Sequence, residues 1–311
     1  MKNEPAAAIG GGLDLTPEGP MNFSIHTKSG RFLLLPSAAF FLALSIIPLS
    51  MLLIFSFLDG NLGPDGSFPG WTTANYVRMF SKTMFSRLMG RSLLIGLIVT
   101  FICILLAYPT AWGIAKVAKE KNRNMLVMLA IVPFFTSQLL LIYAMMVILQ
   151  SRGLLMSLMG FLGLADPSGS ILYSLPAVVI VLVYEYLPYM ILCLYASLEG
   201  IPDNLVYASR TMGAGRFKTF INVILPLSMP GLMSGIMLVL IPVVGSFVEP
   251  GLVGGSGGMM IGSLINSQFN TVLDMGYGSA LSFVFLLCLS LIMYVIRALS
   301  VRVNKTIGGL A

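Results

Sequence analysis

The stretch SLLIGLIVTFICILLAYPTAWGIA, residues 92–115, decides the class of fold. It contains no Asp, Glu, Lys or Arg. A helix rising about 1.5 Å per residue over this length crosses the roughly 30 Å hydrocarbon core of a bilayer. Its apolar residues are continuous and do not alternate, unlike those of a strand in a transmembrane barrel. The stretch therefore predicts a membrane-spanning α-helix.

Five more stretches of this kind predict an all-α polytopic membrane protein with six spans. One of them must tolerate a single acidic residue, Glu185. The composition agrees, because 57% of the residues are hydrophobic and only 10% are charged, whereas a soluble domain carries about 25% charged residues. The mean hydropathy is +0.93. The five stretches are 32–58, 124–151, 167–198, 219–248 and 275–296.

The positive charges are divided unequally between the two sides of the membrane. If both termini lie on one side, that side carries 13 of the 18 Lys and Arg residues. Because such residues accumulate in cytoplasmic loops, both termini are expected in the cytoplasm. The net charge of +6 then reflects topology, and no nucleic-acid partner is expected. We expect a flexible cytoplasmic tail over 1–31, a six-helix transmembrane domain over 32–300, and a cytoplasmic tail over 301–311.

Few side chains suit catalysis or metal binding. The three cysteines lie singly in apolar runs, and the one histidine, His26, lies in the polar N-terminal tail. No phosphate-binding G-x-x-x-x-G-K-[ST] motif is present. No enzymatic activity, metal or cofactor bound by this chain is therefore expected. The chain lacks the nucleophile–base set that a membrane-embedded enzyme needs. It also lacks the internal repeat that ion-coupled carriers often show.

The loop at 199–218 predicts a short amphipathic helix on the cytoplasmic side. Pro202 and Asp203 mark its start, and Gly213 is suited to end it with a positive φ. A second helix is expected to begin near Gly215 and to continue into the fifth span. The short helix is suited to docking into a groove of another protein, or to lying among lipid headgroups through its basic residues. One face carries Leu205, Ala208, Ser209 and Met212, and the basic residues are Arg210, Arg216 and Lys218.

The same loop resembles the signature of permease subunits of binding-protein-dependent ABC importers. That signature has Glu-Ala-Ala, three residues, Gly, nine residues, Ile, one residue and Leu-Pro. Here Tyr207-Ala208-Ser209, Gly213, Val223 and Leu225-Pro226 keep the spacing, with Tyr207 in place of the acidic residue. The runs 185–192, 243–255 and 260–262 are similar to permeases of the spermidine/putrescine type.

The resemblance implies a non-catalytic permease subunit of the bacterial inner membrane. It implies a second, homologous permease in a heterodimer, two ATPase subunits that bind ATP and Mg, and an external solute-binding protein. The cargo implied is a small cationic, polyamine-like solute moved into the cytoplasm; an opine, another amine or ferric iron is the alternative. The loop would be the coupling helix in a cleft of the ATPase, with Tyr207, Ala208, Ser209, Met212, Gly213, Ala214, Leu225 and Pro226 as coupling residues.

Two acidic residues are candidates for lining the substrate path. Glu185 lies in the middle of the fourth span, where a carboxylate costs about 2.5–3.5 kcal/mol on insertion scales. Tyr184 precedes it and Tyr189 follows one turn later, which suits an organic cation; a neutral glutamic acid bonded to a neighbouring span is the alternative. Glu249 begins the glycine-rich segment 249–263, which either folds back into the membrane mouth or forms an outside linker. Glu249 itself either offers a cation site or contacts the binding protein.

Overall fold

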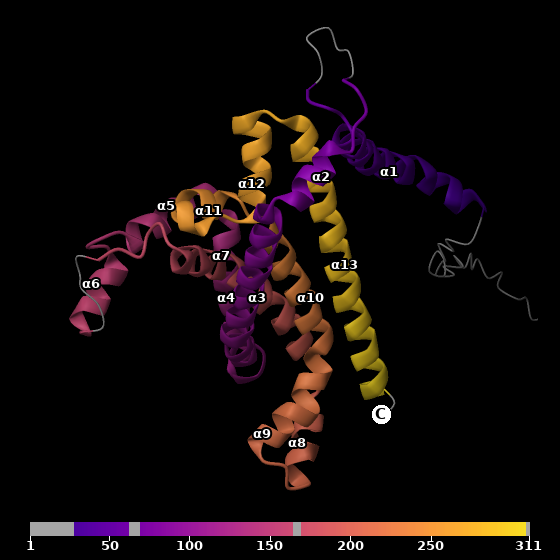
Figure 1. Cartoon of the computed structure of the whole chain (residues 1–311). Helices are drawn as coiled ribbons and strands as arrows, with labels where there is room; N and C mark the ends of the chain where they lie inside the picture. Colours follow the sequence, from indigo (N-terminus) through magenta and orange to yellow (C-terminus); the bar gives the residue numbers. More distant parts are fainter. Residues whose placement is uncertain (1–27, 62–68, 164–168, 309–311) are drawn as a thin grey trace, which may run out of the picture. The chain divides into compact units, whose positions relative to one another are not determined.

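The structure is a computed structural model that describes residues 28–61, 69–163 and 169–308. The chain divides into two units, Met1–Ser50 and Met51–Ala311, which are described separately. The β-pairing among the described residues is one isolated bridge between Leu58 and Trp71. The helices of Figure 1 are α1 (Lys28–Ser56), α2 (Ala74–Ser81), α3 (Thr83–Trp112), α4 (Glu120–Ile131), α5 (Gln138–Leu149), α6 (Leu154–Phe161), α7 (Leu175–Glu199), α8 (Asp203–Thr211), α9 (Arg216–Thr219), α10 (Leu225–Gly245), α11 (Val248–Val253), α12 (Ile261–Ser267) and α13 (Met275–Gly308).

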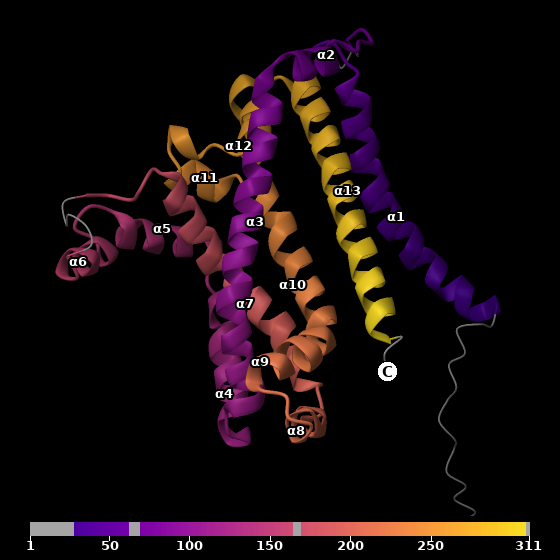
Figure 2. The ribbon, with the colours of Figure 1, turned by 60° about the horizontal axis from the view of Figure 1, so that its bottom comes forward.

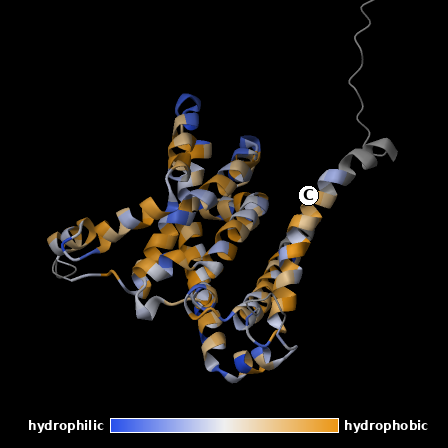
Figure 3. Ribbon diagram, turned by 90° about the horizontal axis from the view of Figure 1, so that it is seen from above, coloured by the Kyte–Doolittle hydropathy of each residue, from blue (hydrophilic) through white to orange (hydrophobic). Residues whose placement is uncertain are grey.

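The described residues contain six helical segments that are long and apolar enough to cross a membrane, which confirms the predicted number of spans. Figure 3 shows apolar residues along the helical shafts and hydrophilic residues gathered mainly near helix ends and loops. Residues 1–27 of the expected tail over 1–31 lie outside the described residues. The last helix continues to Gly308, within the segment expected as the C-terminal tail. The segments are Ala39–Ser56, Thr83–Val117, Gln138–Phe161, Leu175–Glu199, Arg216–Gly245 and Met275–Ala298.

The first unit contributes the greater part of α1. The side chains described between Phe40 and Leu49 are exposed and, apart from Ser45, apolar. A helix that is apolar around its surface suits a lipid environment.

The third span is not the single helix that was predicted over 124–151. The chain leaves α4, makes a 3₁₀ turn over Val132–Phe135 and enters α5. Proline lacks an N–H group and its ring clashes with the preceding turn, so Pro133 explains why α4 cannot continue. Figure 2 shows α5 and α6 running across the direction of α3, α7 and α10. The break brings the start of α5 to the middle of the second unit.

The core of the second unit is formed where α7 packs between α3 and α10. Val99 of α3, Leu194 of α7 and Val239 of α10 are completely buried there. Glycines on α10 allow the close approach, because a Cβ atom at Gly231 would lie 2.4 Å from the backbone oxygen of Cys193. Small residues at helix contacts are typical of membrane bundles, where close packing replaces the hydrophobic effect.

A second core cluster lies where α2, α12 and α13 meet the start of α3. Met79, Ile261 and Leu281 are completely buried in it. Polar contacts tie the same elements together: Arg78 pairs with Asp274 at 2.8 Å, and the Arg78 guanidinium lies 4.2 Å from the ring centre of Tyr277. These contacts hold α2 to the start of α13.

Candidate functional site

The predicted short helix is present as α8 and begins at Asp203, where the sequence placed its start. Gly213 has a φ of +85°, the left-handed conformation that suits glycine and ends the helix. The buried face of α8 carries Val206 and Ser209. Of the four residues predicted to share one face, only Ser209 is buried. Its hydroxyl lies 3.2 Å from that of Thr219, so α8 is tied to α9.

The other residues of the signature divide into an exposed group and a packed group. Tyr207 is 65% exposed and Met212 is 83% exposed, and Leu205, Ala208 and Gly213 are exposed beside them. These five residues form what we call the α8 surface. Ala214, Leu225 and Pro226 are half-buried, and Leu225 begins α10 after a π-helical turn over Phe220–Ile224. The signature therefore supplies an exposed surface at α8 and a packed connection to α10.

One residue that anchors α8 was missed by the sequence analysis, which counted it only as a topological charge. The ammonium group of Lys116 donates to the backbone oxygen of Ile201 at 2.5 Å and to the carboxylate of Asp203 at 2.8 Å. Its side chain is only 12% exposed. Lys116 lies on a π-helical turn, Gly113–Val117, that continues α3. No local motif marks it, because its partners are remote in sequence.

The two acidic candidates, which the sequence places in separate segments, come together in the structure. Glu249 on α11 is only 2% exposed. One oxygen of its carboxyl group accepts from the Gln138 amide at 2.8 Å and the other accepts from the hydroxyl of Ser246. The carboxyl group of Glu185 on α7 interacts with both Glu249 and Gln138. We call Glu185, Glu249 and Gln138 the acidic cluster.

A pocket of about 200 Å³ opens beside the acidic cluster. Glu185 and Tyr189 lie on its α7 wall. The opposite wall is the break between α4 and α5, which exposes Pro133 and Thr136 to the pocket. Tyr184 is exposed and lies outside the pocket lining, whereas Tyr186 packs against Tyr189 with ring centres 5.8 Å apart. The lining residues are Pro133, Thr136, Gln138, Leu141, Glu185, Pro188 and Tyr189.

The acidic cluster brings two carboxyl groups together without a basic side chain. Among the described residues the salt bridges use Arg78, Lys116 and Arg123, so neither acid of the cluster pairs with a basic side chain. One oxygen of Glu185, Oε2, is buried without a hydrogen-bond partner in this part of the chain. Two neighbouring carboxylates destabilise one another when both are ionised, and either a proton on one of them or a nearby cation offsets that cost.

The glycine-rich segment around Glu249 packs into the second unit. Pro250 and Val253 of α11 are buried, and so is Met260 before α12. A Cβ atom at Gly254 would lie 2.8 Å from a methyl group of Val178 on α7. The segment is therefore packed against α7, and this packing brings Glu249 close to Glu185. Among the described residues, no group of three or more His, Cys, Asp and Glu side chains is arranged to hold a metal ion.

Curated relatives include importer permeases. The chain is 36% identical over 267 residues to the spermidine/putrescine transport system permease protein PotB of Salmonella typhimurium, covering 85% of this chain and 91% of that protein. The Escherichia coli K12 protein of the same description is 36% identical over 263 residues, covering 84% and 94%. The inner membrane ABC transporter permease protein YdcU of Escherichia coli K12 is 29% identical over 243 residues, covering 74% and 77%.

Solved structures share the fold. A chain of a bacterial alginate ABC transporter, in complex with an alginate pentasaccharide-bound periplasmic protein, superposes with a TM-score of 0.68 at 17% identity and covers 88% of this chain and 94% of that one. A chain of the MetNI methionine ABC transporter gives a TM-score of 0.51 at 19% identity, with coverage of 72% and 96%.

The family described as binding-protein-dependent transport system inner membrane component matches residues 82–307, which include α3, the α8 loop, the acidic cluster and most of α13. With this match and the identity to the PotB permeases, the chain belongs to that family and is a multi-pass permease subunit of a bacterial inner-membrane ABC importer.

Proposed function

We propose that this permease carries a small organic cation of the polyamine class into the cytoplasm, driven by ATP hydrolysis on partner subunits. The observation that carries the proposal is the acidic cluster: Glu185 lines the pocket together with Tyr189, Glu249 lies beside Glu185, and neither carboxyl group has a basic partner among the described residues. Carboxylates accept hydrogen bonds from ammonium groups, and aromatic faces attract cations. The description of the PotB relatives as spermidine/putrescine permeases supports the same class of cargo.

The partners follow from the family and from the α8 surface. We infer a second, homologous permease, two ATPase subunits that bind ATP and Mg, and an external solute-binding protein. The α8 surface is available for a groove of the ATPase, because Tyr207 and Met212 are exposed while Ser209 holds the helix to the bundle. In this arrangement both termini, the tail over 1–31 and the residues after 300 lie in the cytoplasm, as the distribution of Lys and Arg favours. The chain itself binds no cofactor.

The roles of the pocket residues follow from their chemistry. Glu185 and Glu249 attract and partly desolvate an ammonium group. Gln138 and Ser246 hold the Glu249 carboxyl group in place through its two oxygens. Tyr189 places its aromatic side chain along the pocket wall. Motion transmitted through α8 would then change access to the pocket from one side of the membrane to the other.

The test is uptake by the assembled importer in vesicles. We expect Glu185→Gln to lower uptake of radiolabelled spermidine or putrescine at least tenfold, equivalent to about 1.4 kcal/mol, because it removes a charge that only a cationic cargo needs. ATP hydrolysis stimulated by the loaded binding protein should persist, which separates a cargo defect from a failure of assembly. Glu120→Gln is the matched control, since Glu120 is exposed at the start of α4.

Uptake by the Glu185→Gln importer equal to that of the wild type would refute a required charge in the pocket. The same assay with unlabelled polyamines, opines and ferric iron as competitors tests the cargo class. Competition by polyamines alone supports the proposal, and competition by opines or by ferric iron assigns a different cargo.

A further inference from the structure

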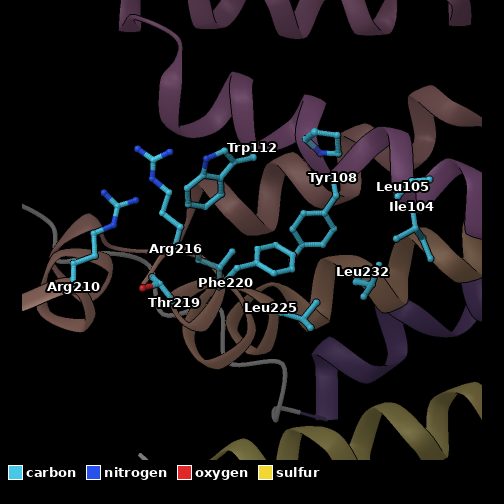
Figure 4. A pocket seen from close by; sticks show the side chains of 12 residues that line it. Ile104, Leu105, Tyr108, Trp112, Arg210, Arg216, Thr219, Phe220, Leu225 and Leu232 are labelled. Carbon is cyan, nitrogen blue, oxygen red and sulfur yellow. The ribbon is translucent and has the colours of Figure 1, made fainter. Parts of the chain in front are cut away.

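A second and larger pocket lies between α3 and the α9–α10 segment, remote from the acidic cluster. Its volume is about 640 Å³. Figure 4 shows residues of α3 on one side and Phe220, Leu225 and Leu232 on the other. Apart from two arginines, the lining is almost entirely apolar or aromatic. The wall on α3 is Ile104, Leu105, Tyr108, Pro109 and Trp112.

The two hydroxyl groups of the pocket lining, those of Tyr108 and Thr219, are already hydrogen-bonded to residues outside the lining. The hydroxyl of Tyr108 is hydrogen-bonded to that of Ser228 across the contact of α3 with α10. The ring of Tyr108 meets the ring of Phe220 edge to face, with centroids 5.2 Å apart. The interior therefore offers a mainly apolar surface with few polar groups to specify a polar ligand.

One end of the pocket is strongly cationic. Arg210 of α8 and Arg216 of α9 both line it and are both exposed. Neither takes part in the salt bridges formed among the described residues. Figure 4 shows their side chains at the same end of the pocket, with the indole of Trp112 beside Arg216. Tryptophan is enriched where the hydrocarbon core meets the headgroups, so Trp112 and the two arginines suit a position at headgroup level.

We propose that the pocket binds an anionic phospholipid, with its phosphate on Arg210 and Arg216 and an acyl chain along the apolar wall of α3. Two unpaired guanidinium groups match a phosphate in charge and geometry. The cavity behind them matches a hydrocarbon chain, and basic pockets between spans are known to take lipid headgroups of this kind. Because Arg210 lies on α8, the bound lipid would contact both the α8 loop and α3.

Lipid retention by the assembled importer tests the site. The importer is reconstituted in discs of equal phosphatidylglycerol and phosphatidylcholine and transferred to mild detergent, and the retained lipids are counted by native mass spectrometry. We expect preferential retention of phosphatidylglycerol. Arg216→Gln and Arg210→Gln should each weaken it about fivefold, the effect of about one basic residue near a charged surface. Lys218→Gln is the matched control, because Lys218 lies on α9 outside the pocket lining.

A second pair of variants tests the apolar part without changing a charge. Leu105→Trp fills the pocket from an exposed position on α3 and should lower retention of phosphatidylglycerol. Leu97→Trp, two turns away and equally exposed to the outside, should leave retention unchanged.

Three results would overturn the proposal. One is equal retention of the two lipids. Another is release of the lipid by millimolar inorganic phosphate from both wild type and Leu105→Trp alike, which would assign the arginines to a free anion. The third is a cross-link from Leu105→Cys to the second permease, which would place a protein helix in the pocket.

Discussion

At the scale of single residues, the structure mainly reveals contacts between residues that lie far apart in the sequence. Glu249 contacts Gln138, which lies 111 positions earlier in the chain. Gly231 is needed because its Cα hydrogen faces the backbone of α7, with no room for a side chain. In both cases the residue type is readable in the sequence, but the reason for it is a contact between helices.

Gly231→Ala should destabilise the bundle by about 1–3 kcal/mol, the usual cost of overpacking. The added Cβ atom would lie 2.4 Å from both the Cys193 oxygen and the Ser197 Cβ atom. Thermal unfolding of the purified protein in detergent measures the change. Gly90→Ala on α3 is the control, because nothing lies within 4 Å of its Cβ position. Equal midpoints for the two variants would contradict the close packing of α10 on α7.

At the scale of elements, the connection between α3 and α8 shows how the α8 loop is attached to the spans. It passes through Lys116 on a π-helical turn, and π-helical turns occur frequently at functional sites. A second π-helical turn, Phe220–Ile224, links α9 to α10. The α8 loop is therefore joined to two spans through irregular helical turns, which is where a change in helix geometry is easiest.

Lys116→Met should lower the amount of solute transported per ATP hydrolysed, because α8 would lose its attachment to α3. Asp203→Asn should have a much smaller effect. Asp203 is 66% exposed, and exposed ion pairs contribute about 0–1 kcal/mol, whereas the bond from a charged amine to the Ile201 oxygen is worth about 1.5–3 kcal/mol.

Simultaneous uptake and phosphate-release assays on the assembled importer measure this ratio. Lys119→Met, which removes an exposed charge three positions away, should leave the ratio unchanged. If Asp203→Asn lowered this ratio as much as Lys116→Met, the ion pair with Asp203, and not the hydrogen bond to the Ile201 oxygen, would attach α8 to α3.

At the scale of the whole molecule, the permease is expected to work only as part of a complex. A tagged chain purified in mild detergent should bring with it a second permease and an ATPase. Gly213→Val should lose the ATPase and keep the second permease, because a β-branched residue at a φ of +85° is strained and displaces the α8 surface.

Gly215→Ala is the matched control, since Gly215 has a φ of −66° and open space at its Cβ position. Mass spectrometry of the purified samples identifies the partners. Recovery of the chain alone, with transport by the reconstituted chain in the absence of ATP, would instead assign an ion-coupled carrier.

The sequence by itself determined the number of spans, the all-α class and the bounds of the α8 loop. A bilayer requires every spanning segment to be apolar and internally hydrogen-bonded, so each span is visible in its own local composition. The start at Asp203 and the turn at Gly213 are likewise local, because they depend on the conformation of one or two residues.

The tertiary structure alone decided three other features. Pro133 divides the apolar run 124–151, and its continuous hydrophobicity did not show that its second half turns across the direction of α3 and α7. Glu185 and Glu249 meet because α11 folds back onto α7, and Lys116 reaches Ile201 because α3 and α7 are packed side by side. These contacts join residues far apart in the chain, and their energies depend on burial, which is set by how all the helices pack and not by any local pattern.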